Sequence, residues 1–124
     1  MGLRDKKTLW RSFVYAFEGL CEVIATERNM RIHLAIATVT VLFAWWLQIP
    51  TDHWLILLLV IAGVFVLEIL NSAIERTVDL VTEDFHPLAK KAKDASAAAV
   101  FVYCLFAVII GLILFLPPLL QKIL

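Results

Sequence analysis

The sequence predicts an all-α integral membrane protein, built from an N-terminal amphipathic surface helix and three transmembrane helices. Of the 124 residues, 62% are hydrophobic, whereas soluble domains have roughly 45–50% apolar residues. The apolar residues gather in three long stretches separated by short polar segments. Basic and acidic residues number eleven each, so the formal net charge is zero and no electrostatic attraction to nucleic acid is indicated. We therefore expect no nucleic-acid partner.

The surface helix is predicted over residues 10–26. Its apolar side chains recur at helical spacing on one face and include Phe13, Phe17, Leu20 and Ile24. Arg11, Glu18 and Glu22 lie on the opposite face. This pattern is typical of a helix that lies in the plane of the membrane interface.

The first span is predicted over residues 29–49 and the second over residues 53–81. The continuous apolar run 34–49 is short for a bilayer, which needs about 20 residues, so the helix is expected to start near Asn29. A tight turn at residues 48–53 follows, with three tryptophans around it as an interfacial belt. Counting about 20 residues from His53 ends the hydrocarbon region near Ala73.

The third span is predicted over residues 95–117. Residues 82–94 (TEDFHPLAKKAKD) are expected to form a polar loop, in which Pro87 restricts His86 to extended backbone geometry. The span opens with small residues that allow close helix packing, and Pro117 and Pro118 are expected to end it.

The orientation follows from the basic residues. Only Lys122 lies beyond the third span, and the other ten lie before the first span or near the second loop: Arg4, Lys6, Lys7, Arg11, Arg28, Arg31, Arg76, Lys90, Lys91 and Lys93. Cytoplasmic segments carry the excess of lysine and arginine. The N-terminus and the 82–94 loop are therefore predicted to be cytoplasmic, while the C-terminus faces outside.

A stripe of polar side chains follows one face of the second span. It is about 100° wide on a helix and consists of Glu68, Asn71, Ser72, Glu75 and Asp79. Ionisable groups inside a membrane are costly and usually mark a site. Glu75 and Asp79 are expected at headgroup depth, and Glu68 about two turns deeper.

The spacing of these acids indicates a site, and by itself it is only weak evidence for a kinase; roles in phosphoryl transfer can nevertheless be named for them. Glu27 and Glu75 are at the right depth to hold Mg²⁺, which takes carboxylate and phosphate oxygens. Glu68 is in drier surroundings, where a carboxylate takes up a proton more readily, so it is a candidate general base. Lys93 and Asp94, with their neighbouring lysines, are candidates for contacts with nucleotide phosphates.

Simpler interpretations stay open for several of these residues. Glu75 and Asp79 can be solvated acids that pair with Arg76 or with the lysines of the loop. The lysines themselves can serve topology and bind anionic lipid. Asn71 can be a hydrogen-bonding contact between helices. Glu68 is the hardest to explain without a function, because apolar residues flank it on both sides.

The motifs EILNSAIERTVD (68–79) and FHPLAKKAKDASAAAV (85–100) resemble the prokaryotic diacylglycerol kinase family. YAFEGL (15–20) and ERNMRIH (27–33) fit the same family, so the resemblance covers residues 10–108. It implies a single membrane kinase domain over residues 1–124, in the bacterial plasma membrane, that forms a homotrimer in which subunits share sites. It further implies phosphorylation of a membrane lipid alcohol by MgATP.

The resemblance also implies residue roles. Glu68 and Asn71 match the catalytic positions, and Glu27 and Glu75 match the metal ligands. Glu68 and Arg31 match substrate-binding positions. The positions that match ATP contacts are Tyr15, Glu27, Glu75, Asp79, His86, Lys93 and Asp94.

The HPLAKKAKD loop looks like the Gram-positive branch, whose members are similar to undecaprenol kinases. Glu18 and Cys21 also replace basic residues that the Gram-negative branch carries. Undecaprenol is therefore the expected acceptor, with diacylglycerol as the alternative. A small proton-coupled transporter that uses Glu68 as its carrier acid is a remote alternative, and a structural membrane subunit is another.

Overall fold

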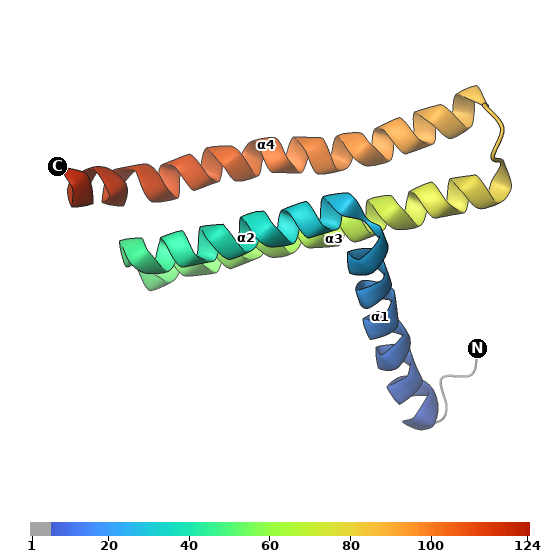
Figure 1. Cartoon of the computed structure of the whole chain (residues 1–124), viewed down its shortest axis with the longest axis horizontal. Coiled ribbons are helices and arrows are strands. Elements are labelled where there is room, and N and C mark those ends of the chain that lie inside the picture. Colours follow the sequence, from blue (N-terminus) through green and yellow to red (C-terminus); the bar gives the residue numbers. More distant parts are fainter. Residues whose placement is uncertain (1–5) are drawn as a thin grey trace.

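The computed structural model describes residues 6–124, with side chains from residue 8 onward, and this part of the chain contains four helices (Figure 1). Arg4 and the side chains of Lys6 and Lys7, used above for orientation, lie outside that description. The helices are α1 (Lys6–Thr26), α2 (Arg28–Leu47), α3 (Thr51–Val81) and α4 (Pro87–Ile123). The last three are long and apolar enough to cross a membrane. The prediction of an all-helical membrane protein is confirmed.

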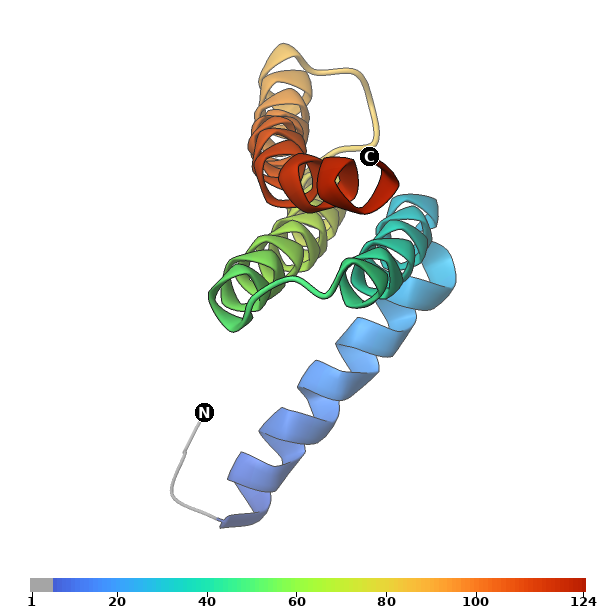
Figure 2. The ribbon, with the colours of Figure 1, turned by 90° about the vertical axis from the view of Figure 1, so that its left-hand side faces the viewer.

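The three long helices lie side by side, and α1 leaves them at a steep angle (Figures 1 and 2). The most extensive contact in the described chain is between α3 and α4. The start of α2, the end of α3 and the start of α4 lie toward the same end of the bundle (Figure 1). The acidic stripe of α3 and the first residues of α4, which the sequence predicted as part of a loop, therefore lie at the same end of the bundle.

The corner between α1 and α2 is held by one arginine and a small apolar contact. Glu27 separates the two helices with an extended backbone (φ −99°, ψ 113°). Arg31 donates from Nη1 to the carbonyl oxygen of Ala25 at 2.7 Å, which satisfies one of the free carbonyls at the end of α1. Val23 and Met30 are buried at the corner. The direction of α1 is therefore set by specific contacts.

Tyr103 and Gly63 fix the approach of α4 to α3. The Tyr103 hydroxyl donates to the carbonyl oxygen of Leu59 at 3.2 Å. A Cβ atom at Gly63 would lie 2.0 Å from that hydroxyl and 2.2 Å from the ring carbon bearing it. Only glycine leaves room for the tyrosine at this point.

The predicted polar loop at residues 82–94 is wrong in most of its length, because α4 begins at Pro87 rather than near Ala95. His86 has the extended geometry predicted for it, and its Nδ1 accepts a hydrogen bond from the Leu88 N–H at 3.1 Å. Proline suits the first helical turn, and the alanine, leucine and lysine residues that follow are strong helix formers. Their polarity suggested a loop, whereas their helix propensity determines the structure.

The predicted stop at Pro117 and Pro118 is also wrong, since α4 continues to Ile123. Lys122 lies beyond the prolines, donates to the carbonyl oxygen of Trp46 at 2.9 Å, and lies 4.7 Å from the centre of that indole ring. Contacts with α2 thus hold the last turns in place despite the prolines. The other helix bounds are close to the predicted ones, with α2 ending at Leu47 and α3 starting at Thr51.

Gly63→Ala should destabilise the α3–α4 contact, because its methyl group overlaps the Tyr103 ring. Overpacking of this kind costs about 1–3 kcal/mol, which a shift in the unfolding midpoint in detergent would measure. Gly111→Ala is the matched control, since a Cβ there meets nothing within 4 Å. In a protein that already carries Tyr103→Ala, the substitutions Gly63→Ala and Gly111→Ala should shift the midpoint by nearly equal amounts, because the ring that meets the methyl group at position 63 is gone. Equal midpoints for the two single variants would contradict this packing.

Candidate active site

The polar stripe of α3 runs from the interior of the bundle to its surface. Glu68 is only 2% exposed, and Asn71 and Ser72 are also buried. Glu75, one turn further on, is half-buried, and Asp79 is exposed. A single helix face therefore joins a dry carboxylate to two wetter ones.

Glu68 faces His33 of α2. The distance between His33 Nε2 and Glu68 Oε2 is 3.5 Å, and the carboxylate side chain is 3% exposed. Sequence reasoning missed His33. One signal was present: it is the last ionisable residue before the apolar run 34–49, and an ionisable group at that depth needs a polar partner.

Asn71 makes two hydrogen bonds, neither of them to Glu68. Its Oδ1 accepts from the buried hydroxyl of Ser96 in α4 at 2.6 Å, and its Nδ2 donates to Glu75 Oε1 at 3.4 Å. The contact between helices considered for Asn71 is therefore present. Ser96 was missed, although it belongs to the small-residue run expected to pack closely.

Arg76 ties the α1–α2 corner to α3. Its guanidinium group forms a salt bridge with Glu22 and donates to Thr26 Oγ1 at 3.1 Å and to Glu27 Oε1 at 3.3 Å. Single exposed ion pairs contribute little, but a network that shares one guanidinium group contributes more. The predicted metal ligand Glu27 is held beside α3 by this network.

Four of the predicted ATP contacts lie around one hollow at the α3–α4 connection. Asp79, His86, Lys93 and Asp94 are among the residues that line it, and its volume is about 420 Å³. Lys93 Nζ lies 2.5 Å from Asp79 Oδ1, and Lys90 Nζ lies 2.5 Å from Asp94 Oδ2. The pairing of Asp79 with a lysine, considered above as a simpler interpretation, is thus observed.

Two predicted residues lie apart from this hollow. Tyr15 is an exposed residue of α1 and does not line it. Arg31 is occupied with the carbonyl oxygens at the end of α1. The structure therefore gives Arg31 a structural contact, and its role toward a substrate stays a prediction.

The number of acids available to hold Mg²⁺ is small. In the described residues, no three His, Cys, Asp or Glu side chains converge as a metal site. Mg²⁺ bound together with a nucleotide commonly has only one or two protein carboxylates, with phosphates and water supplying the other oxygens. Glu27 and Glu75 fit that requirement on the chemistry of their oxygens.

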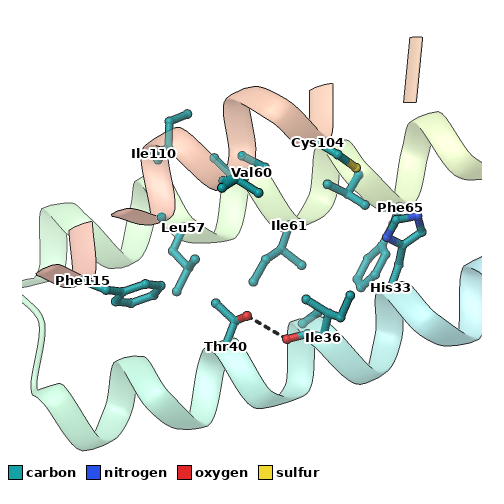
Figure 3. Close-up of a pocket in the computed structure, with 15 residues that line it drawn as sticks. His33, Ile36, Thr40, Leu57, Val60, Ile61, Phe65, Cys104, Ile110 and Phe115 are labelled. Atoms are coloured by element: carbon teal, nitrogen blue, oxygen red, sulfur yellow. Dashed lines mark hydrogen bonds between the residues drawn. The ribbon is translucent and has the colours of Figure 1, made fainter. Parts of the chain in front are cut away.

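An apolar groove lies between α2, α3 and α4 (Figure 3). Its volume is about 410 Å³. His33, Phe65 and Cys104 line one end of it, while Leu57 and Phe115 lie toward the other (Figure 3). A hydrocarbon chain is the kind of ligand that such a lining accepts.

Comparison with known proteins agrees with this arrangement. Residues 14–115 match the sequence profile of the family described as prokaryotic diacylglycerol kinase. The chain belongs to this family. It is accordingly a lipid kinase, a phosphotransferase that uses ATP and has an alcohol group as acceptor. The remote alternatives, a proton-coupled transporter and a structural subunit, are set aside by this finding.

Individual relatives cover most of the chain. An undecaprenol kinase from Bacillus subtilis is 47% identical over 110 residues, which are 89% of both proteins. A diacylglycerol kinase from Synechocystis is 43% identical over 89% of this chain and 63% of its own length. A diacylglycerol kinase from Escherichia coli is 34% identical over 81% of this chain and 82% of its own.

Arg76→Gln should loosen α1 from the bundle, because the guanidinium network is what joins Glu22 and Glu27 to α3. Amide hydrogen exchange across residues 20–27 should become several-fold faster, since a local opening that loses about 1 kcal/mol speeds exchange roughly 5-fold. Arg28→Gln is the control, an exposed arginine for which the described side chains offer no ion-pair partner within 4 Å. Unchanged exchange in Arg76→Gln would contradict the role of the Arg76 network in holding α1 to α3.

Proposed function

We propose that this kinase transfers the γ-phosphoryl group of ATP to undecaprenol, giving undecaprenyl phosphate and ADP. The observation that carries the proposal is the 47% identity, over 89% of both chains, with the Bacillus subtilis undecaprenol kinase. The Escherichia coli diacylglycerol kinase is 34% identical. The HPLAKKAKD segment favours the same choice. Diacylglycerol, phosphorylated to phosphatidic acid, is the alternative acceptor.

Glu68 acts as the general base in this proposal. As the alcohol oxygen bonds to the γ-phosphorus, its proton passes to Glu68, and the bond from that phosphorus to the β–γ bridging oxygen breaks to release ADP. The proton later leaves Glu68 for solvent. The apolar groove supports this role, because a chain lying in it would have its head at His33, which contacts Glu68. Asn71, fixed by Ser96, keeps this part of α3 aligned, and Arg31 is assigned to the lipid headgroup region.

Glu27 and Glu75 would hold Mg²⁺, which supplies electrostatic stabilisation of the transferring phosphoryl group when it is bound. Glu27 must then give up its contact with Arg76, while the hydrogen bond that Glu75 accepts among the described residues is the long one from Asn71.

The nucleotide would lie in the hollow at the α3–α4 connection. Lys93 can exchange its partner Asp79 for a phosphate, as can Lys90 its partner Asp94. His86 would contact the base or ribose from its place just before α4, where it caps the helix, and Tyr15 would approach from α1. Each of these groups supplies position and charge rather than covalent chemistry, which is what phosphoryl transfer requires.

The proposal includes a homotrimer in the bacterial plasma membrane. Large apolar side chains such as Val39, Leu59 and Phe101 are exposed along the long helices and need lipid or another subunit to cover them. The site residues lie at the bundle end that carries nearly all basic residues, which supports a cytoplasmic N-terminus and an outer C-terminus. α1 would lie along the inner interface, with its exposed Trp10, Phe13 and Phe17 toward lipid.

The purified protein in lipid should phosphorylate undecaprenol faster than diacylglycerol when both are offered with MgATP. Glu68→Gln should lower kcat by about 100-fold or more, because general base catalysis contributes 10²–10⁴-fold. Transfer from labelled ATP to each lipid measures both results. A preference for diacylglycerol would contradict the assignment of undecaprenol as the substrate. Near wild-type transfer by Glu68→Gln would contradict the role of Glu68 as general base.

Glu75→Ala should raise the Mg²⁺ concentration needed for half-maximal activity by about 10-fold or more, because one of two carboxylate ligands is lost. A magnesium titration at saturating ATP measures this change. Asp52→Asn is the control, since Asp52 is an exposed acid in the first turn of the same helix. An unchanged titration for Glu75→Ala would refute the metal role.

A further inference from the structure

One histidine contacts the proposed base and has no part in the mechanism above. His33 Nε2 lies 3.5 Å from Glu68 Oε2, and the two side chains are 18% and 3% exposed. His33 comes from α2 and Glu68 from α3, so the contact joins two helices rather than two turns of one helix. A polar contact between a buried and a partly buried ionisable group from separate helices requires both side chains to be placed for it.

The other polar groups of the buried stripe form no hydrogen bond with the Glu68 carboxylate: the Ser72 hydroxyl is buried without a hydrogen-bond partner among the described residues. Asn71 bonds to Ser96 and Glu75. No hydrogen bond to the Glu68 carboxylate is formed by the described side chains, and His33 is its one basic neighbour within 4 Å among them. From α4, the ionisable group that faces the same space is the thiol of Cys104. Among the described side chains, His33 is thus the basic group that contacts the Glu68 carboxylate.

We propose that His33 is a positioning residue for Glu68, an inference that rests on the role of Glu68 in the proposed function. An N–H at Nε2 would donate to Oε2 and leave Oε1 to take the proton from the lipid alcohol. Contacts of this kind are often long before the substrate is bound and tighten in the reacting complex. Holding one oxygen matters, because a reacting group misplaced by about 1 Å can cost 10²-fold in rate.

The position of His33 also relates the base to the groove. The imidazole lines the groove end at which Phe65 and Cys104 meet (Figure 3). An alcohol that arrives along the groove therefore approaches the pair from the side that His33 occupies. Its hydroxyl would first meet His33, which lines the groove and contacts the Glu68 carboxylate.

Two substitutions of similar size separate positioning from packing. His33→Leu fills the space without a hydrogen-bond donor, whereas His33→Gln keeps an N–H that can reach Glu68. With the full-length protein in lipid, His33→Leu should lower kcat about 10- to 100-fold and leave KM for MgATP within about 2-fold. His33→Gln should keep kcat within about 3-fold of wild type. His53→Gln is the matched control, a partly buried histidine at the far end of α3, and it should behave as wild type.

A double-mutant cycle with Glu68→Gln completes the test. If His33 acts through Glu68, adding His33→Leu to Glu68→Gln should lower the residual rate by less than about 2-fold, because the effects of coupled residues do not add. Equal losses in His33→Leu and His33→Gln, a change confined to the KM for lipid, or full additivity in the cycle would each overturn the inference. Full activity of Glu68→Gln would instead overturn the proposed function, so the two failures are distinguishable.

Discussion

Burying the carboxyl group of Glu68 among apolar helices is the constraint on which the rest of the structure depends. An acid taken out of water is costly unless polar groups are brought to it. The chain does this with His33 from α2, while Asn71 and Ser96 lock α3 to α4 one turn away. Gly63 and Tyr103 bring the same two helices close further along. The contacts that pack the three helices together therefore also place the Glu68 carboxyl group.

Periodicity and hydropathy predicted the long helices well, because these signals are local. The acidic stripe on α3 and the extended geometry of His86 were predicted for the same reason. The 82–94 loop and the stop at Pro117 were wrong because polarity and proline were weighed without tertiary context. Helix propensity extends α4 at its start, and Lys122 holds its last turns against Trp46.

Pairings between helices could not be predicted from the stripe alone. A helical wheel places Glu68, Asn71 and Glu75 on one face, but it does not say which residue of α2 or α4 meets each of them. His33, Ser96 and the contacts of Arg76 required the three-dimensional arrangement. The candidate site was thus recognised on α3, while its supporting residues on the other helices were missed. The family resemblance gave roles for residues, but it did not say which side chains contact one another.

Helix α3 fixes the distance between a buried acid, Glu68, and an exposed one, Asp79. It runs unbroken from Thr51 to Val81, and Glu68 and Asp79 are about 16 Å apart along its axis. Adding or removing one residue between them would turn the acids apart by about 100°. Changes in helix length at the Thr51 end, by contrast, leave the relative orientation of these acids unchanged. The length of the membrane-spanning half and the spacing of the acidic side chains are therefore set by separate parts of one helix.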